Sequence, residues 1–175
     1  MFPTVKKVSH SITIPVSNAV EINDAKEDQI ISIAYDKSVA LIRINCPGLD
    51  GDDWVIEVFT ALKECSTAFD MVSIQPHQVS FTVKSGLVDT VYDSLEKLEF
   101  HPESVADCVR LSVRGSCGQP LLSTITAVAE TLAQFNIPIL RLAESYGLIE
   151  VLIEAEYISE ARKALAKRFN VYIHC

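Results

Sequence analysis

The sequence predicts an α+β fold made of two copies of one β-α-β-β-α-β unit. The main observation is an internal repeat with a spacing of 70 residues, which holds without a slip from Val55 to Leu165. It relates helix-spaced and strand-spaced apolar positions alike. Examples are Val55 and Ile125, Phe81 and Val151, and Leu95 and Leu165. One register over that length indicates two copies of the same structural unit.

The spacing of apolar residues predicts the elements of each unit. In the first unit, residues 39–45 alternate as a half-buried strand, and Asp52 or Asp53 can cap the helix that follows. Further elements of this unit are a helix at 54–65, strands at 70–74 and 78–84, and a helix at 87–98, with a closing strand at either 98–101 or 103–106. Those of the second unit are a strand at 108–114, a helix at 121–135, strands at 137–143 and 148–155, a helix at 158–169 and a closing strand at 171–174.

This order is that of two ferredoxin-like domains in tandem, each with two helices on one face of an antiparallel sheet. We expect an N-terminal extension at 1–35 with one or two strands, a first domain at 36–106 and a second domain at 107–175. Within the extension, 9–16 reads as a strand. Residues 29–35 either extend the first strand of the first domain or add a strand to an edge. One domain can also take a strand from beyond the other.

Composition narrows the function. The chain has 175 residues, of which 49% are hydrophobic and 22% charged, with a net charge of -8. A negative chain without clustered Lys and Arg is a poor partner for nucleic acid. No apolar run approaches a membrane span of about 20 residues, and the first residues do not resemble a signal peptide. The five cysteines are odd in number and lack a C-x-x-C pair, which disfavours disulfides and structural zinc. We expect a cytoplasmic chain without a nucleic-acid, membrane or cofactor partner.

No arrangement of residues stands out as catalytic or metal-binding. The four histidines are scattered along the chain, as His10, His77, His101 and His174. Two Gly-x-x-Gly segments lack the Lys-Ser/Thr of a phosphate loop. Cys117 lies just before a predicted helix, where a thiolate is stabilised, although it also reads as an ordinary loop thiol. A non-enzyme is therefore the first expectation.

The first strand-to-helix loop suggests a binding site. The helix that follows it presents unpaired backbone N–H groups at Trp54, Val55 and Ile56, which suit a small carboxylate. Asp70 opens the next strand, and its carboxylate could hold an ammonium group. Together these groups could hold a free amino acid. The negative charge of Asp53 opposes binding of the ligand's carboxylate, and Asp53 can equally be interpreted as a helix cap. Trp54 can also be interpreted as a packing residue.

Several short segments resemble one family. The stretch 31–40 is similar to the segment that opens the regulatory tail of aspartate kinases, and Glu57-Val58-Phe59-x-x-Leu62 is similar to the first regulatory helix there. Asp70-Met71-Val72-Ser73, followed by 79–83, resembles a D-[LM]-[IV]-[ST] strand and its partner strand. Glu156-x-x-x-Glu160-Ala161 matches the second repeat. The resemblance spans about 30–171, without a kinase domain.

This resemblance implies tandem ACT domains, which are ferredoxin-like sensors of amino acids. It implies that two such chains join their sheets in a dimer, and that an effector such as lysine or threonine sits between domains at the first loop and the next strand. The matching positions, as implied ligand-binding residues, are Gly48, Gly51, Asp53, Trp54, Val55, Asp70, Ile74 and Gln75.

The sequence departs from the family pattern at this site. Asp53 stands where the family usually has glycine, Ile74 where a hydroxyl residue is common, and Leu140 where the first unit has Asp70. Three hypotheses follow. The first is a non-catalytic regulator that binds an amino acid at an inter-domain or dimer interface and acts on an aspartate-pathway or other enzyme. The second is an interaction module that dimerises or docks on a partner enzyme without a ligand. The third is a small enzyme that uses Cys117 or a histidine.

Overall fold

The computed structural model describes residues 30–46, 53–65, 68–115 and 121–171. Several sequence-based expectations lie outside these residues. They are the strand at 9–16, the cap Asp52, the loop glycines Gly48 and Gly51, and the side chains of His10, Cys117 and His174.

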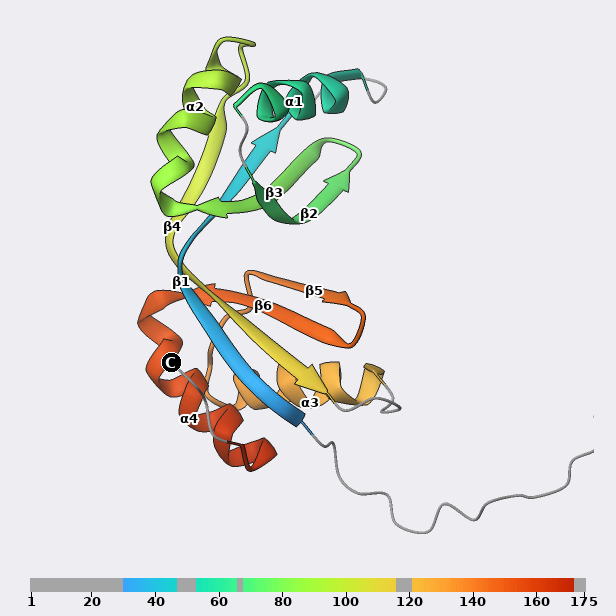
Figure 1. Ribbon diagram of the computed structural model, residues 1–175, viewed down its shortest axis with the longest axis vertical. Coiled ribbons are helices and arrows are strands. Elements are labelled where there is room, and N and C mark those ends of the chain that lie inside the picture. The colour runs from blue at the N-terminus through green and yellow to red at the C-terminus, as the bar shows by residue number, and fades with distance from the viewer. Residues whose placement is uncertain (1–29, 47–52, 66–67, 116–120, 172–175) are drawn as a thin grey trace, which may run out of the picture.

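Within these described ranges, six strands and four α-helices follow the predicted order (Figure 1). The first half has β1 (Ile30–Asn45), α1 (Asp53–Glu64), β2 (Phe69–Gln75), β3 (Gln78–Lys84), the 3-10 turn η1 (Ser85–Leu87) and α2 (Val88–Glu96). The second half has β4 (Pro102–Gly115), α3 (Leu121–Gln134), β5 (Arg141–Ser145), β6 (Leu148–Glu154), the 3-10 turn η2 (Ala155–Tyr157) and α4 (Ile158–Phe169).

All six strands belong to one antiparallel sheet in the order β2-β3-β1-β4-β6-β5. The central strands β1 and β4 are long, with 16 and 14 residues, and they pair with each other along most of their length. Figure 1 shows them running through the whole molecule, with α1 and α2 at one end and α3 and α4 at the other. The fold class is therefore the predicted one: tandem ferredoxin-like units with helices on one face of each part of the sheet.

The first unit closes its sheet with its own segment, and the second takes a segment from before the first unit. The beginning of β4 pairs with the end of β1, so the first unit's closing strand begins at Pro102. The beginning of β1 pairs with the end of β4, for example Ile33 with Val113. Residues 30–36 thus hold the place beside β4 that we predicted for 171–174. That prediction is wrong at Val171, which is not in a strand, and its other residues lie outside the described ranges.

We call the two parts the first and second lobes. The first lobe contains α1, α2, β2, β3 and the adjoining segments 39–45 and 102–106, and the second contains α3, α4, β5, β6 and the segments 30–36 and 108–115. Each lobe has its own core between sheet and helices. Val58 and Leu62 in the first lobe, and Val128 and Leu132 in the second, are fully buried. Ile33, which precedes the predicted first domain, packs in the second core.

The faces of the sheet without helices pack against each other between the lobes. A third cluster joins Leu41, Met71, Cys108 and Leu152, each from a different strand. Alternation in β3 predicts that Val79, Phe81 and Val83 point inward, and all three are buried. Ser80 and Thr82, on the opposite face of the strand, are also buried. Alternation did not predict their burial, because it cannot show that another part of the chain covers the second face.

The strand predicted at 137–143 forms later, at Arg141–Ser145. Pro138 has no N–H to donate to a neighbouring strand, which is consistent with pairing that starts beyond it. Ile137 is nevertheless buried and the Leu140 N–H donates to the Leu152 carbonyl at 2.9 Å, so the segment is held in place. Among the described residues, no helix is both long and apolar enough to cross a membrane.

Candidate functional site

Asp70 lies at the start of edge strand β2 and faces β4. Its carboxylate accepts a hydrogen bond from the Arg110 guanidinium, with 2.8 Å between Oδ2 and Nη1. The Asp70 side chain is 62% exposed, whereas the Arg110 side chain is only 19% exposed. The predicted acceptor for an ammonium group therefore already holds a cation, and it does so at a position that solvent reaches.

Arg110 holds further carboxylates from the strands beside it. Asp36 Oδ2 lies 3.6 Å from its Nη2, and Glu150 Oε1 lies 3.6 Å from its Nε. Asp36 also pairs with Lys84, and its Oδ1 accepts a 3.1 Å hydrogen bond from the Ser38 N–H. The bond from Lys84, helped by the Ser38 N–H, holds the pKa of Asp36 below its ordinary value against the opposing effect of burial. Asp36 sits where β1 passes from one lobe to the other, so this network links both lobes.

A second arginine crosses from β5 to the first lobe. Arg141 Nη1 donates to the Met71 carbonyl at 2.8 Å, and its Nη2 donates to the Ser80 hydroxyl. Burial, with a smaller contribution from Arg43, lowers the pKa of Arg141. Sequence analysis missed both Arg110 and Arg141. The available signal was a charged residue placed between apolar residues of a strand, but no spacing rule indicates which residues such a side chain will meet.

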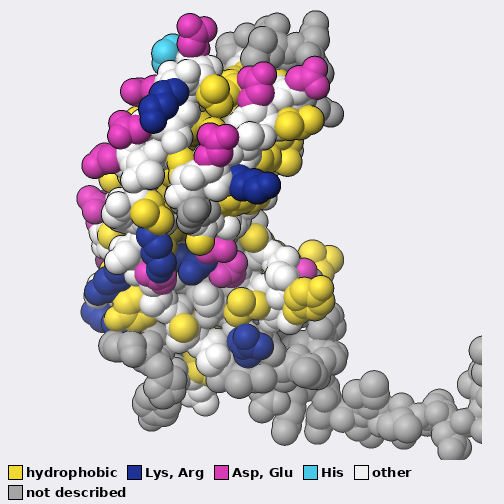
Figure 2. All heavy atoms as spheres, turned by 45° about the horizontal axis from the view of Figure 1, so that its top comes forward, with side chains coloured by type: hydrophobic (Ala, Val, Ile, Leu, Met, Phe, Trp, Pro, Cys, Tyr) yellow, Lys and Arg dark blue, Asp and Glu magenta, His cyan; other side chains and the backbone are white. Residues whose placement is uncertain are grey.

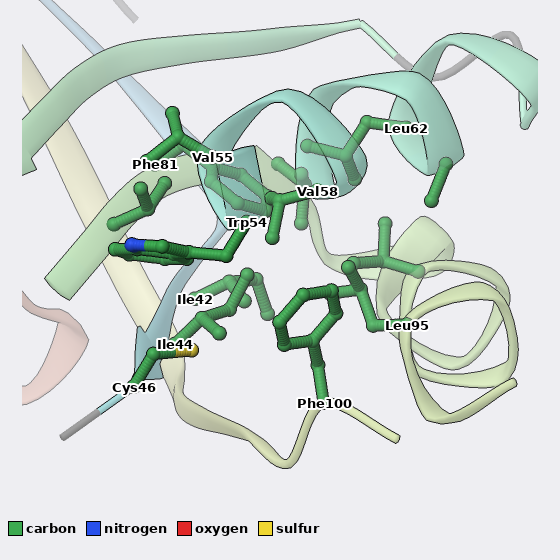
Figure 3. Packing of buried hydrophobic residues seen from close by; sticks show 14 of the residues in the cluster. Ile42, Ile44, Cys46, Trp54, Val55, Val58, Leu62, Phe81, Leu95 and Phe100 are labelled. Atoms are coloured by element: carbon green, nitrogen blue, oxygen red, sulfur yellow. The ribbon is translucent and has the colours of Figure 1, made fainter. Parts of the chain in front are cut away.

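At the start of α1, one predicted ligand-binding residue is exposed to solvent and two are buried in the core. Asp53 is exposed, but Trp54 and Val55 are buried, with 3% and 8% exposure. Figure 3 shows the Trp54 indole among Ile44, Cys46 and Val55. The packing interpretation of Trp54 is therefore correct for its side chain. Its Nε1–H has no hydrogen-bond partner among the described residues.

Ile74 and Gln75 lie at the other end of β2 from Asp70. Ile74 is 56% exposed, and Gln75 pairs with Gln78 across the hairpin. Gln75, Asn45 and His77 line an open hollow of about 400 Å³, where Gln78 donates to the Asn45 side chain at 2.7 Å. This hollow lies where β1 ends, which is the end of the sheet at which α1 begins (Figure 1).

The eight predicted residues therefore do not form one group. Gln75 is five positions from Asp70 along β2, which corresponds to about 16 Å in an extended strand. The start of α1 and Gln75 share one end of the first lobe, and Asp70 lies with Arg110 near the second lobe. Since Gly48 and Gly51 are outside the described residues, the complete ligand site stays a prediction.

Metal and redox chemistry find little support in the described ranges. No group of three or more His, Cys, Asp or Glu side chains there could hold a metal ion. Cys46 and Cys108 are free thiols, and burial raises the pKa of both. A raised pKa makes a thiol a poor nucleophile at neutral pH.

Comparison with known proteins shows that the chain is similar to the regulatory parts of aspartate kinases. No family model matches the chain. Aspartokinase 1 of Bacillus subtilis is 26% identical over 150 residues, which cover 85% of this chain and 37% of that protein. The regulatory subunit of aspartate kinase from Thermus thermophilus, solved in a ligand-free form, is 27% identical with a TM-score of 0.69 and matches 80% of this chain and 98% of its own. A structure of aspartokinase alpha and beta subunits matches with a TM-score of 0.72 at 23% identity, over 81% of this chain and 99% of that one.

The fold and these matches define the class as a tandem ACT-like chain that is similar to aspartate kinase regulatory subunits. The predicted resemblance is confirmed, because the matching structures are aspartate kinase regulatory subunits and regulatory domains. These residues correspond to the regulatory part of such enzymes and not to their kinase domain. The expectation that this chain does not itself catalyse agrees with that correspondence.

Proposed function

We propose that this chain is a cytoplasmic, non-catalytic regulator that binds a small amino acid, lysine-like or threonine-like, at an inter-domain or dimer interface. Through that ligand it adjusts the activity of an aspartate-pathway enzyme or another enzyme of amino-acid metabolism. The observation that carries the proposal is the match to an aspartate kinase regulatory subunit over 98% of that subunit's chain, at 27% identity. The free thiols are consistent with a reducing compartment.

The ligand's ammonium group would bind at Asp70. This carboxylate is 62% exposed, and an exposed ion pair contributes little net stability, so an incoming ammonium can replace the guanidinium of Arg110 at low cost. The ligand's carboxylate would meet backbone N–H groups at the start of an α1 helix. Because Asp70 and the start of α1 lie at different ends of one chain's β2, a second copy of the chain would supply one of the two groups.

Binding at Asp70 would change the packing of the lobes through Arg110. Once it is released from Asp70, the Arg110 guanidinium still has two carboxylate partners at 3.6 Å. They are Asp36 on the central strand β1 and Glu150 on β6 of the second lobe. A ligand that favours the released arrangement shifts the equilibrium toward it by as much as its affinities for the two arrangements differ. That shift is the signal that a partner enzyme would read.

A thermal titration with each of the twenty amino acids tests this function. A ligand at about 100 times its dissociation constant should stabilise the protein by about 2.7 kcal/mol, seen as a higher melting temperature. Asp70→Ala should abolish this response, while Asp89→Ala, an exposed acid on α2, should retain it. Absence of a response to all twenty amino acids would refute sensing.

A ligand-free interaction module is the second candidate. Two observations favour it: Asp70 is already paired with Arg110, and Asp53 occupies the position where the family usually has glycine. In that case Arg110 serves only to hold the lobes together. The second candidate predicts that Asp70→Ala leaves the dimer and every partner complex unchanged, because no ligand site exists to be lost.

A further inference from the structure

A groove runs between α1 and α2 on the outer surface of the first lobe. It has a volume of about 300 Å³, and Ala61, which is 5% exposed, lies at its base. Two large apolar side chains line it and stand in solvent: Ile56 is 64% exposed and Leu98 is 44% exposed. Single exposed apolar residues are common on protein surfaces, but two that flank one groove are typical of a binding surface.

The helices that form this groove are acidic. Glu57 and Glu64 line it, and Lys97 is its only basic lining residue. In their full length α1 and α2 carry six acidic residues and one lysine, whereas α3 and α4 carry two acidic residues and four basic ones. Most acidic side chains visible in Figure 2 lie over the first lobe. The groove therefore favours a partner that brings positive charge beside its apolar contacts.

The second lobe provides an internal comparison. At the 70-residue spacing, Ile56 corresponds to Thr126 and Leu98 to Arg168, both exposed and polar. Some buried positions of the same helices are unchanged, such as Leu62 and its counterpart Leu132, whereas the buried Trp54 and Ala61 have buried threonines, Thr124 and Thr131, as counterparts. The fold of the unit thus does not require apolar residues at Ile56 and Leu98, and their presence in the first lobe needs another reason.

We propose that this groove is a docking site for an amphipathic, basic helix of a partner protein. The apolar side chains of that helix would pack on Ile56 and Leu98, and its Lys or Arg residues would face Glu57 and Glu64. A helix seated between two helices with anchors at i, i+3, i+4 and i+7 is a common mode of peptide recognition. This docking site does not involve Asp70, and it uses the side chain of Ile56, whereas the proposed amino-acid site would use backbone N–H groups at the start of α1. Its failure in a test would leave the amino-acid response intact, and the reverse also holds.

A fluorescent peptide of about 15 residues, with leucines at i, i+3, i+4 and i+7 and flanking lysines, is a suitable probe. Fluorescence anisotropy with the full chain would measure its dissociation constant. The variant I56T/L98R places the second lobe's residues in the groove and should weaken binding at least about tenfold. The control L122T/F135R removes two exposed apolar side chains from the second lobe, 74% and 49% exposed, and should leave the affinity unchanged.

A variant with reversed charge in the groove distinguishes a lost contact from a misfolded chain. The variant E57K/E64K should bind the basic peptide more weakly and an otherwise identical peptide with glutamates in place of its lysines more tightly, which a misfolded chain would not do. Higher salt should weaken both complexes. Equal affinity of the wild type and I56T/L98R, or no saturable binding by the wild type, overturns the proposal. Sedimentation would also overturn it if the wild type were a dimer and I56T/L98R a monomer, because a second copy of the chain would then cover the groove.

Discussion

At the start of β2 the first lobe has Asp70, whereas the corresponding position of the second lobe, before β5, is Leu140. The next position differs as well: Met71 packs between the lobes, and its counterpart Arg141 reaches across and donates to the Met71 carbonyl. Two residues that the repeat makes equivalent therefore contact each other, one contributing a backbone acceptor and the other a guanidinium. The repeat has become asymmetric at the surface where the lobes meet.

Several core positions, in contrast, are the same in both lobes, although Phe81 corresponds to Val151 and Trp54 to Thr124. Val58, Leu62 and Leu95 are fully buried, and so are Val128, Leu132 and Leu165 at the 70-residue spacing. A close-packed interior tolerates little change in volume, whereas an exposed position tolerates most substitutions. The two sites proposed above therefore lie where the lobes differ at the surface, with the exposed carboxylate of Asp70 and the groove between α1 and α2 both on the first lobe.

The largest expected effect on stability comes from truncating one buried leucine in the core of each lobe. Leu62→Ala and Leu132→Ala should each destabilise the protein by about 2–5 kcal/mol through lost contacts and a residual cavity. Because β1 and β4 run through both lobes, we expect one common unfolding transition in calorimetry. Each variant should lower its midpoint temperature. Two separate transitions, of which each variant shifts only one, would mean that the lobes fold independently.

Removing the link between the lobes should have the next largest effect. Arg110→Ala leaves Asp36 and Glu150, with side chains 29% and 22% exposed, without this cation and should cost about 1–3 kcal/mol of stability in urea denaturation. The matched control is Arg114→Ala on the same strand, since Arg114 is exposed and forms no ion pair within the described residues. Equal losses for the two variants would show that Arg110 does not hold the lobes together.

The smallest effect concerns acid stability at the junction of β1. The pKa of Asp36 is lowered in the folded state, so its stabilising contribution is present above its ordinary pKa of about 3.9 and is lost as pH falls through the lowered value. Asp36→Asn should therefore reduce stability slightly at neutral pH and flatten its decline below about pH 4. Stability measured from pH 2 to pH 7 tests this, with Asp89→Asn as the control. A parallel decline in wild type and Asp36→Asn would refute the role of Asp36.

Periodicity predicted most of the fold because each element's own residues determine it. The helix at 158–169 and the strand at 78–84 have the predicted bounds. The prediction of a strand at Val171 was wrong, because strand pairing depends on segments far apart in sequence. Residues 30–36 pair with the end of β4, and the local pattern did not show where this segment would pair.

The candidate site shows the same limit more sharply. Sequence analysis identified Asp70 as an acid facing a cation, but the cation present is Arg110, which is 40 positions away. The 70-residue repeat, read from the chain alone, determined two similar cores, because burial follows from apolar spacing. Only the folding of the sheet upon itself decided that Ser80 and Thr82 are buried, that Arg141 reaches Met71 and that Asp70 lies apart from the start of α1. Such contacts depend on distances between strands, and a linear pattern does not contain them.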